Sequence, residues 1–378
     1  MANNNKHTGP NVPALRFPEF SGEWEKMSLQ DCCSDFSYGL NAPAKAYDGV
    51  NKYIRITDID ENTSVYKSDD PVSPDGLLSD EYLVNENDIL FARTGASTGK
   101  TYLYNQNDGR LFYAGFLIKA NVNNNCDPYF IFSQTKTQSY RRWVEIMSTR
   151  SGQPGINSQE YASYPLYVPS KEEQEKIALL LRCLDKRILV QSKIIEEHET
   201  LLKSLADKLI SSQMANMVLN DCVIARASTM KEGELEPSGV YPVFGASGLC
   251  GYSNEALEES DSILVTKDGS GVGTCQYATG AHSFLGTLCS LTVKEGVYLP
   301  YVYYALLNFN FALFKTGLAI PHIYFKDYGK AVIYCPSYDE QVRIASGLEK
   351  IEAKIKSDKE LLKLYQLQKE YLLSRMFI

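Results

Sequence analysis

The sequence predicts an α+β protein in which two pseudo-repeated α/β domains are joined by two long helices that form an antiparallel coiled coil. Three observations predict this fold. The 378 residues suffice for two or three domains of about 150 residues each. Two segments begin with the same Pro-Ser-x-x-Glu-Gln pattern, which ends at Gln174 in the first half and at Gln341 in the second. Each pattern is followed by apolar residues spaced alternately four and three apart, as in a coiled coil.

Composition narrows the class of protein. Hydrophobic residues make up 44% and charged residues 22%, which excludes a disordered or collagen-like chain. The net charge of −8 argues against a protein that coats nucleic acid without specificity. No apolar run approaches the roughly 18 residues of a membrane span, and the polar N-terminus lacks the apolar core of a signal peptide. We therefore expect a cytoplasmic protein that has no contact with a membrane.

The repeat sets the expected domain boundaries. Ile177, Leu181 and Ile188 recur as Ile344, Leu348 and Ile355, at the same offset that separates Gln174 from Gln341. An earlier block, residues 89–95 followed by Gly99, resembles residues 263–269 followed by Gly273. We expect a flexible tail, a first domain, a central helix, a second domain and a C-terminal helix, at residues 1–13, 14–168, 169–213, 214–335 and 336–378.

Short apolar runs predict the strands of each domain. In the first domain these are residues 53–56, 88–91 and 116–118, and in the second they are 262–265 and 290–293. We expect one helix per domain as well, near residues 128–143 and 300–314.

Two apolar seams predict that the long helices pack on each other. A helix of about 40 residues, about 60 Å long, cannot bury such a seam alone. The alternative, two amphipathic helices on separate cores, fits the narrow and matched seams less well. Ser170 and Glu173 have the spacing of a capping box at the start of the first helix. The first seam comprises Ile177, Leu181, Leu184, Ile188, Gln191, Ile195, His198, Leu202, Leu205 and Leu209, and the second Ile344, Leu348, Ile351, Ile355, Asp358, Leu362, Tyr365, Lys369, Leu372 and Met376.

Several motifs suggest catalysis but fail on spacing. Residues 95–101 (Gly-Ala-Ser-Thr-Gly-Lys-Thr) have three residues between the glycines, whereas a phosphate-binding loop needs four. Residues 127–130 (Asp-Pro-Tyr-Phe) lack the second proline of the Asp-Pro-Pro-Tyr motif of amino-methyltransferases, and a proline at a helix start explains them better. None of the four histidines has a metal-ligand spacing, and His198 is better explained as a polar residue of the seam. These absences favour a binding protein over an enzyme.

Polar and basic side chains in the glycine turns, and in the later segments 140–157 and 316–326, are candidates for DNA contact. Arginine forks match guanine and phosphate, and amides match adenine. For any one residue, a solvated helix end or loop is the alternative explanation. The second domain offers fewer cations. The candidates are Arg93, Lys100, Arg141, Arg142, Arg150, Gln153 and Asn157 in the first domain, and Lys267, Ser270, His322 and Lys326 in the second.

These features together resemble the specificity subunit of type I restriction–modification systems. The resemblance covers nearly the whole chain, and its most specific element is the duplicated order of domain, long helix, domain, long helix. The matching motifs are residues 13–20 (Pro-Ala-Leu-Arg-Phe-Pro-Glu-Phe) with Glu23-Trp24, Asp88-Ile89-Leu90 leading to Arg93, Gly95 and Gly99, residues 241–245 (Tyr-Pro-Val-Phe-Gly) with Gly251-Tyr252, and the two Pro-Ser-x-x-Glu-Gln helix starts.

The resemblance implies a role for each part. Each domain would be a target-recognition domain that reads one half of a split double-stranded DNA target, and the helices would set the gap between the halves. Two modification subunits would dock on this frame, and ATP-dependent restriction subunits would join for cleavage. The chain itself would have no catalytic residue and no cofactor, with S-adenosylmethionine, ATP and magnesium on the partner subunits. The alternatives are a standalone DNA methyltransferase or nuclease with a degenerate motif, and a coiled-coil scaffold that does not bind DNA.

Overall fold

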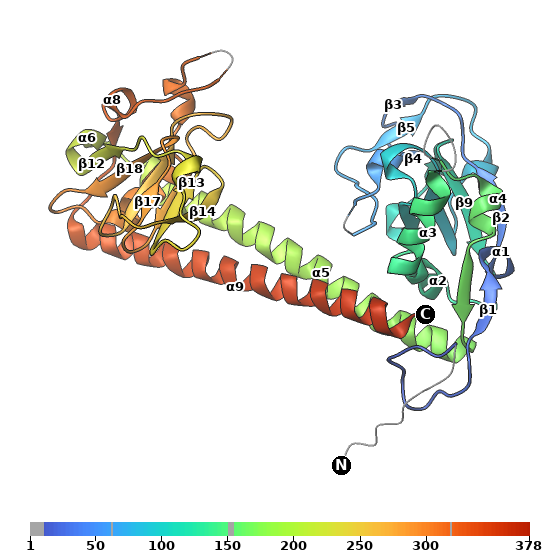
Figure 1. The fold of residues 1–378 in the computed structure, drawn as a ribbon. Helices are drawn as coiled ribbons and strands as arrows, with labels where there is room; N and C mark the ends of the chain where they lie inside the picture. Colours follow the sequence, from blue (N-terminus) through green and yellow to red (C-terminus); the bar gives the residue numbers. More distant parts are fainter. Residues whose placement is uncertain (1–10, 62, 150–154, 318–319) are drawn as a thin grey trace. The chain divides into compact units, whose positions relative to one another are not determined.

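The computed structural model describes residues 11–61, 63–149, 155–317 and 320–378 (Figure 1). The chain divides into two units. The first comprises the residues up to Ser192 together with Leu361–Ile378, and the second comprises Lys193–Glu360. Each long helix therefore contributes one part to each unit. None of the helices in the described residues is long and apolar enough to cross a membrane.

The core of the first unit is an antiparallel sheet in the order β2-β9-β6-β7. All five residues of β6 are buried, which explains its unbroken apolar run. Three two-stranded pairs, β1–β10, β3–β5 and β4–β8, surround the core. The strands are β1 (Glu25–Ser28), β2 (Cys33–Tyr38), β3 (Ala44–Ala46), β4 (Lys52–Ile54), β5 (Val72–Pro74), β6 (Asp88–Ala92), β7 (Thr101–Leu103), β8 (Leu111–Tyr113), β9 (Leu117–Val122) and β10 (Pro165–Val168).

The helical segment expected at residues 128–143 is two helices, not one. The hydroxyls of Thr135 and Thr137 donate to carbonyls of the preceding turn, and the Thr137 hydroxyl also accepts from the Tyr140 N–H. Threonine thereby ends one helix and caps the next, which propensity alone does not reveal. The helices are α1 (Leu29–Cys32), α2 (Pro128–Gln134), α3 (Gln138–Ser148) and α4 (Ser158–Ala162), with short 3₁₀ turns η1 (Ile56–Asp58), η2 (Asp80–Tyr82), η3 (Gly95–Ser97) and η4 (Gln106–Asp108).

The expected strand at 53–56 is also shorter than predicted. Strand β4 ends at Ile54, because the Asp58 carboxylate accepts from the backbone N–H and the guanidinium of Arg55 and thereby starts the η1 turn.

The second unit repeats the core of the first. Its antiparallel sheet has the order β12-β18-β15-β16, which matches β2-β9-β6-β7 strand for strand. The predicted duplication is confirmed at the level of topology. Two surrounding pairs also recur, since the antiparallel pair β11–β19 corresponds to β1–β10 and the parallel pair β13–β17 corresponds to β4–β8. The second unit differs in that β14 joins β13 and makes a three-stranded sheet. The strands are β11 (Met217–Val218), β12 (Val223–Ala227), β13 (Tyr241–Gly245), β14 (Gly248–Ser253), β15 (Ser262–Thr266), β16 (Cys275–Ala278), β17 (Ser283–Phe284), β18 (Leu288–Val293) and β19 (Val332–Ile333).

The helix expected at 300–314 is likewise divided. It ends at Leu307, and a 3₁₀ turn follows in which the Asn310 side chain accepts from the Ala312 N–H. The helices and turns of this unit are α6 (Leu219–Cys222), α7 (Leu299–Leu307), α8 (Phe325–Tyr328), η6 (Glu232–Glu234) and η7 (Phe311–Phe314).

The long helices α5 (Lys171–Ala206) and α9 (Tyr338–Met376) pack antiparallel, as predicted. In the first unit the start of α5 lies against the end of α9, and Lys369 Nζ is 2.5 Å from Asp185 Oδ1. In the second unit the end of α5 lies against the start of α9, and His198 Nδ1 is 3.2 Å from Asp358 Oδ2. Separate cores for the two helices are therefore excluded.

Two details of the helix prediction are wrong. At the end of α5 the seam shifts by one residue, so that Leu209 is exposed while Ala206 and Ile210 are buried. The cause is the π turn η5 (Asp207–Ser211), whose wider spiral rotates the following side chains. At the start of α5 the Ser170 hydroxyl accepts from the Glu173 N–H, but the Glu173 carboxylate does not complete a capping box, because it accepts two hydrogen bonds from Arg16.

Candidate nucleic-acid interface

A glycine turn follows the central buried strand in each domain. In the first, the Gly99 N–H donates to the Ala92 carbonyl across 3.0 Å, and in the second the Gly273 N–H donates to Thr266 across 2.8 Å. Both glycines have positive φ, 88° and 90°. A Cβ at Gly99 would lie 2.6 Å from Val144 Cγ1, and one at Gly273 would lie 2.7 Å from Phe311 Cβ. Glycine is therefore required for a close approach of the turn to its own domain.

A second loop lies against this turn in both domains. The Ile156 N–H donates to the Arg93 carbonyl across 3.0 Å, and the Ile323 N–H donates to the Lys267 carbonyl across 2.9 Å. Arg93 and Lys267 thus occupy the same place in the two domains. Each is followed along the chain by the glycine turn and is fixed from outside by the loop that leads into a short helix, α4 or α8. In each domain the glycine turn, the returning loop and the short helix form one loop surface. Most of the predicted DNA-contact residues lie on these two surfaces: Arg93, Lys100 and Asn157 on the first, and Lys267, Ser270, His322 and Lys326 on the second.

Arg93 lies over an exposed tyrosine. Its guanidinium carbon is 4.8 Å from the centroid of the Tyr38 ring, within the range of a cation–π interaction. The Tyr38 hydroxyl accepts from the Ser158 N–H at the start of α4, at 3.2 Å. Burial opposes ionisation of Tyr38, but the Ser158 amide and the Arg93 cation together lower its pKa. Tyr38 is therefore anchored at both its ring face and its oxygen.

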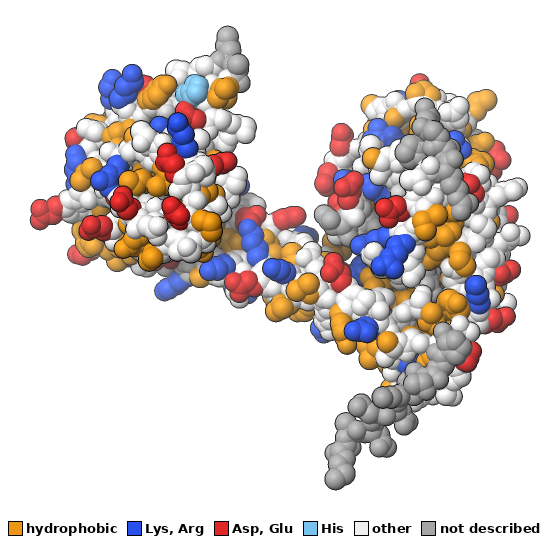
Figure 2. All heavy atoms as spheres, viewed as in Figure 1, with side chains coloured by type: hydrophobic (Ala, Val, Ile, Leu, Met, Phe, Trp, Pro, Cys, Tyr) orange, Lys and Arg blue, Asp and Glu red, His pale blue; other side chains and the backbone are white. Residues whose placement is uncertain are grey.

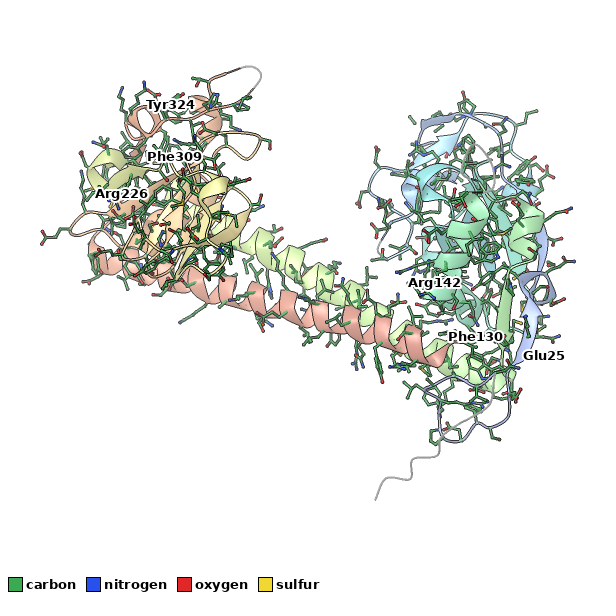
Figure 3. The ribbon with its side chains drawn as sticks, in the orientation of Figure 1. Glu25, Phe130, Arg142, Arg226, Phe309 and Tyr324 are labelled. Carbon is green, nitrogen blue, oxygen red and sulfur yellow. The ribbon has the colours of Figure 1, made fainter. Side chains whose placement is uncertain are left out.

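The other cations of the first domain differ in availability. The Lys100 ammonium is 3.0 Å from the Glu61 carboxylate, and its side chain is largely covered. Arg141 and Arg142 are exposed on α3, while their neighbours Tyr140 and Trp143 stack with each other on the inner side of the helix. Figure 2 shows Lys and Arg side chains gathered around α3, and Figure 3 labels Arg142 there.

Three residues complete the predicted set of the first domain. Asn157 is exposed, but its side-chain oxygen accepts from the Glu160 N–H and caps α4, so that only its amide nitrogen is available to another partner. Arg150 and Gln153 lie outside the described residues.

The second domain places its predicted residues around one tyrosine. Lys326 Nζ is 5.4 Å from the centroid of the Tyr324 ring, and the His322 ring stacks on Tyr324 at 6.5 Å and 19°. His322 Nδ1 is 2.7 Å from the Asp268 carboxylate. Lys267 is half-buried beside this group, and Ser270 is exposed in the glycine turn. Figure 3 labels Tyr324 beside α8.

Prediction from the sequence missed Tyr38 as a member of the first surface. It lies 120 residues before its partner Ser158, and no local pattern joins the two. Tyr324 stands inside a segment that the sequence indicated, but its contacts with His322 and Lys326 depend on the folded loop.

A second duplicated feature joins each domain to its long helix. The Gln174 side chain accepts from the Asp127 N–H and donates to the Pro169 carbonyl, both at 2.9 Å. Gln341 does the same with Tyr298 and Pro336 at 2.8 and 2.9 Å. Both glutamines are fully buried. This explains why the Pro-Ser-x-x-Glu-Gln pattern occurs twice.

A pair of carboxylates completes the junction. The Tyr129 hydroxyl donates to Asp185 of α5, and the Tyr304 hydroxyl donates to Glu352 of α9 across 2.7 Å. Asp185 and Glu352 are separated by the same offset as the two buried glutamines. Each domain is therefore joined to its long helix by the same two kinds of hydrogen bond, one from a backbone N–H to a buried glutamine and one from a tyrosine hydroxyl to a carboxylate.

No group of three or more His, Cys, Asp or Glu side chains in the described ranges is placed to hold a metal ion. The glycine turn after β6 also does not suit a nucleotide phosphate-binding loop, because the ammonium of its lysine, Lys100, is paired with the Glu61 carboxylate. Each domain thus presents one surface built from loops on its own four-stranded sheet.

Comparison with known proteins agrees with this geometry. The model of the type I restriction modification DNA specificity domain matches residues 21–200 and 213–364. The chain belongs to this family. The two matched stretches are its two DNA specificity domains, so that its function is recognition of DNA. A standalone methyltransferase and a scaffold that does not bind DNA are not supported.

Individual relatives are distant. A stretch of 117 residues is 24% identical to the type I restriction enzyme EcoprrI specificity subunit of Escherichia coli, covering 31% of this chain and 29% of that protein. The fold resembles the crystal structure of the type I restriction–modification S subunit from M. genitalium, with a TM-score of 0.68 and 19% identity over 97% of this chain and 99% of that one. A chain from a structure of a type I restriction–modification system matches with a TM-score of 0.54 and 14% identity over 93% and 97% of the two chains.

Proposed function

We propose that this chain selects a bipartite DNA target for a type I restriction–modification complex, with each domain reading one half of the target. The observation that carries the proposal is the duplicated loop frame. The same strand, glycine turn and returning loop occur in both domains, yet they present different side chains, Arg93 in one and Lys267 with His322 in the other. One frame that presents two sets of side chains suits the reading of two different sequences.

The chain acts without chemistry of its own in this proposal. Two modification subunits dock on it and transfer the methyl group of S-adenosylmethionine to DNA, and restriction subunits supply the ATP- and magnesium-dependent step. The complex works in the cytoplasm, where it meets the DNA of the cell.

Exposed apolar residues on the long helices offer a docking surface for the modification subunits. Leu364, Leu367 and Tyr371 lie along one side of α9, at a spacing of three and four residues, and are at least half exposed. Leu179, Leu189 and Val190 add apolar surface on the α5 part of the same unit. Exposed apolar side chains in this number are typical of an interaction site.

Methylation mapping tests the proposal directly. The full chain is combined with its modification subunit and S-adenosylmethionine, and methylated adenines are mapped on a random-sequence DNA library. We expect two short specified sequences separated by a gap of fixed length. Methylation of unrelated single sites, or methylation by the purified chain alone, would contradict the proposal.

The exposed arginines give a second test. Arg141→Ala or Arg142→Ala should weaken binding of the complex to DNA, with a change in the salt dependence of about one charge if the side chain contacts phosphate. Lys26→Ala on β1 removes an exposed cation of the same domain that is not among the candidate DNA contacts, and it serves as the control. Equal effects of the three substitutions would show that α3 does not face DNA.

The helices are proposed to set the gap. One helical turn is about 5.4 Å and one base-pair step about 3.4 Å, so four residues inserted near Gln191 should lengthen the gap by about one to two base pairs. The half-site sequences should stay the same, because the reading loops lie outside the helices. A full-activity variant with an unchanged gap would show that helix length does not set it.

A further inference from the structure

In both domains an exposed tyrosine lies at the start of the short helix, α4 or α8, with a cationic side chain beside its ring. The two tyrosines do not occupy equivalent positions in the repeated sequence. Tyr38 comes from strand β2 and reaches the start of α4, where its hydroxyl accepts from the Ser158 N–H. Tyr324 is the residue that immediately precedes α8, the helix equivalent to α4. Tyr38 is 40% exposed and Tyr324 47% exposed, so both rings can be reached by a ligand.

A bulge in β2 positions Tyr38. The register against β9 shifts between Ser34 and Ser37, with Asp35 at φ 55°, and Tyr38 then pairs with Ile118. Such bulges re-aim the side chains that follow them. The equivalent strand β12 pairs with β18 without a shift and ends in Ala227, a residue too small to reach the loop. The second domain instead takes its tyrosine from the loop itself.

The two tyrosines hold different cations. Tyr38 carries Arg93, whose planar fork can donate two parallel hydrogen bonds to O6 and N7 of guanine. Tyr324 carries Lys326, a point charge suited to phosphate but without a fork. The His322 imidazole also stacks on Tyr324, and its Nδ1 is hydrogen-bonded to the Asp268 carboxylate.

We propose that Tyr38 is a specificity-positioning residue that holds Arg93 against a guanine of the first half-site, and that Tyr324 with Lys326 contacts the DNA backbone without reading a base. This rests on the proposed function. It adds that the two tyrosine sites have different roles. Tyr38 with Arg93 selects a base, and Tyr324 with Lys326 strengthens binding to any sequence.

The test uses the full chain with its modification subunit, and measures methylation and binding over a DNA library. Tyr38→Leu and Arg93→Lys should relax the same single position of the first half-site, which is a guanine in the wild type. The preference for guanine over the other bases should fall about tenfold or more at that position. Tyr38→Phe should keep most of the preference, because its ring can still stack on the guanidinium and only the hydrogen bond from Ser158 is lost.

The second site is tested in parallel. Tyr324→Leu and Lys326→Gln should weaken binding to all sequences alike and leave the second half-site unchanged. Lys326→Gln should also reduce the slope of log K against log salt by about 0.9, the value of one phosphate contact.

Each outcome decides the proposal. It is wrong for the first domain if Tyr38→Leu and Arg93→Lys relax different positions, or if neither relaxes one. It is wrong for the second if Tyr324→Leu changes the preferred sequence of its half-site. Arg93→Lys keeps a cation at the surface and serves if Tyr38→Leu folds poorly. A wild-type complex without any bipartite preference would instead contradict the proposed function.

Discussion

The two domains have the same frame and present different surfaces on it. The four-stranded sheet has the same order in both, and the glycine turn and its returning loop make the same backbone hydrogen bonds. The parallel pair β4–β8 recurs as β13–β17, but the strands around these pairs differ, since β14 joins β13 in the second domain while β3 and β5 form a separate pair in the first. The features that fix backbone position are therefore repeated, and the side chains that can meet DNA are not.

This division has a physical reason. Buried hydrogen bonds and close backbone contacts tolerate few changes, because each loss costs about 1–3 kcal/mol. Exposed side chains on a fixed loop can vary at little cost. A duplicated domain can thus diverge in what it recognises while its support stays the same. The comparison predicts that equivalent changes have equal effects where the two frames make the same contacts, and unequal effects where the contacts or the surface side chains differ.

The largest effect is expected from the second glycine of each turn. Gly99→Ala and Gly273→Ala combine a positive φ with a clash, and each should lower the free energy of unfolding of its own unit by about 2–4 kcal/mol. Gly95→Ala and Gly269→Ala are matched controls with a positive φ but open space around the Cβ, and about 1 kcal/mol is expected.

The two units can be followed separately in this experiment. The two tryptophans of the chain, Trp24 and Trp143, both lie in the first unit, so their fluorescence reports its unfolding alone, while far-UV circular dichroism reports both units. Gly99→Ala should shift the fluorescence transition and Gly273→Ala should not. A large shift for only one of the two clashing variants would show that the frames are not equivalent.

The glutamines of the junctions should come next. Gln174→Ala and Gln341→Ala each remove buried hydrogen bonds between a domain and its long helix, and a loss of about 1–3 kcal/mol is expected for both. Hydrogen exchange gives a local readout, because the amides of Asp127 and Tyr298 lose their acceptor and should exchange faster. Unchanged exchange at either amide would show that the glutamine does not hold that junction in solution.

Removal of the hydroxyl from one equivalent pair of tyrosines should change the free energy of unfolding differently in the two units. The Tyr161 hydroxyl donates to the Ala92 carbonyl at 2.7 Å and accepts from the Gly99 N–H at 3.1 Å. The hydroxyl of Tyr328, at the same place in the second domain, has only the weakly hydrogen-bonding Cys289 thiol beside it in the described part of the chain, and burial raises its pKa. Tyr161→Phe should therefore destabilise the first unit by about 1 kcal/mol, and Tyr328→Phe should leave the second unit unchanged or more stable.

Thermal unfolding with the same two probes measures this difference. A similar loss for both phenylalanine variants would mean that Tyr328 finds a hydrogen-bond partner in solution, and the two frames would then be more alike than the structure shows.

The sequence predicted what repeats and what is periodic. The offset between Gln174 and Gln341 located both long helices, and the seams located the buried face of each, because helix pairing follows local spacing. The acidic pair Asp185 and Glu352 lies at the same offset and could have been predicted from it. The helix breaks at Thr137 and after Leu307 could not, since they depend on single side-chain hydrogen bonds.

The candidate site was less predictable for a different reason. Arg93 and Lys267 could be predicted as candidates from the sequence, because each stands between a buried apolar strand and a glycine turn. Tyr38 reaches its place through a bulge and a contact 120 residues away, and the pairing of Lys100 with Glu61 joins two loops. Contacts of this kind leave no periodic signal in one sequence.

The smallest effect on stability is expected from the ion pair between Lys100 and Glu61. The second domain cannot form this pair at the same place, because the residue equivalent to Lys100 is Thr274. An exposed pair contributes at most about 1 kcal/mol, so Glu61→Gln should change stability little. It should free Lys100 and make the slope of log K against log salt steeper by up to about 0.9 if that ammonium then reaches a phosphate. Glu86→Gln makes the same charge change at an exposed glutamate of the same domain and is the control. If both variants give the same slope, Lys100 does not contact DNA, and the first domain relies on Arg93 and the arginines of α3.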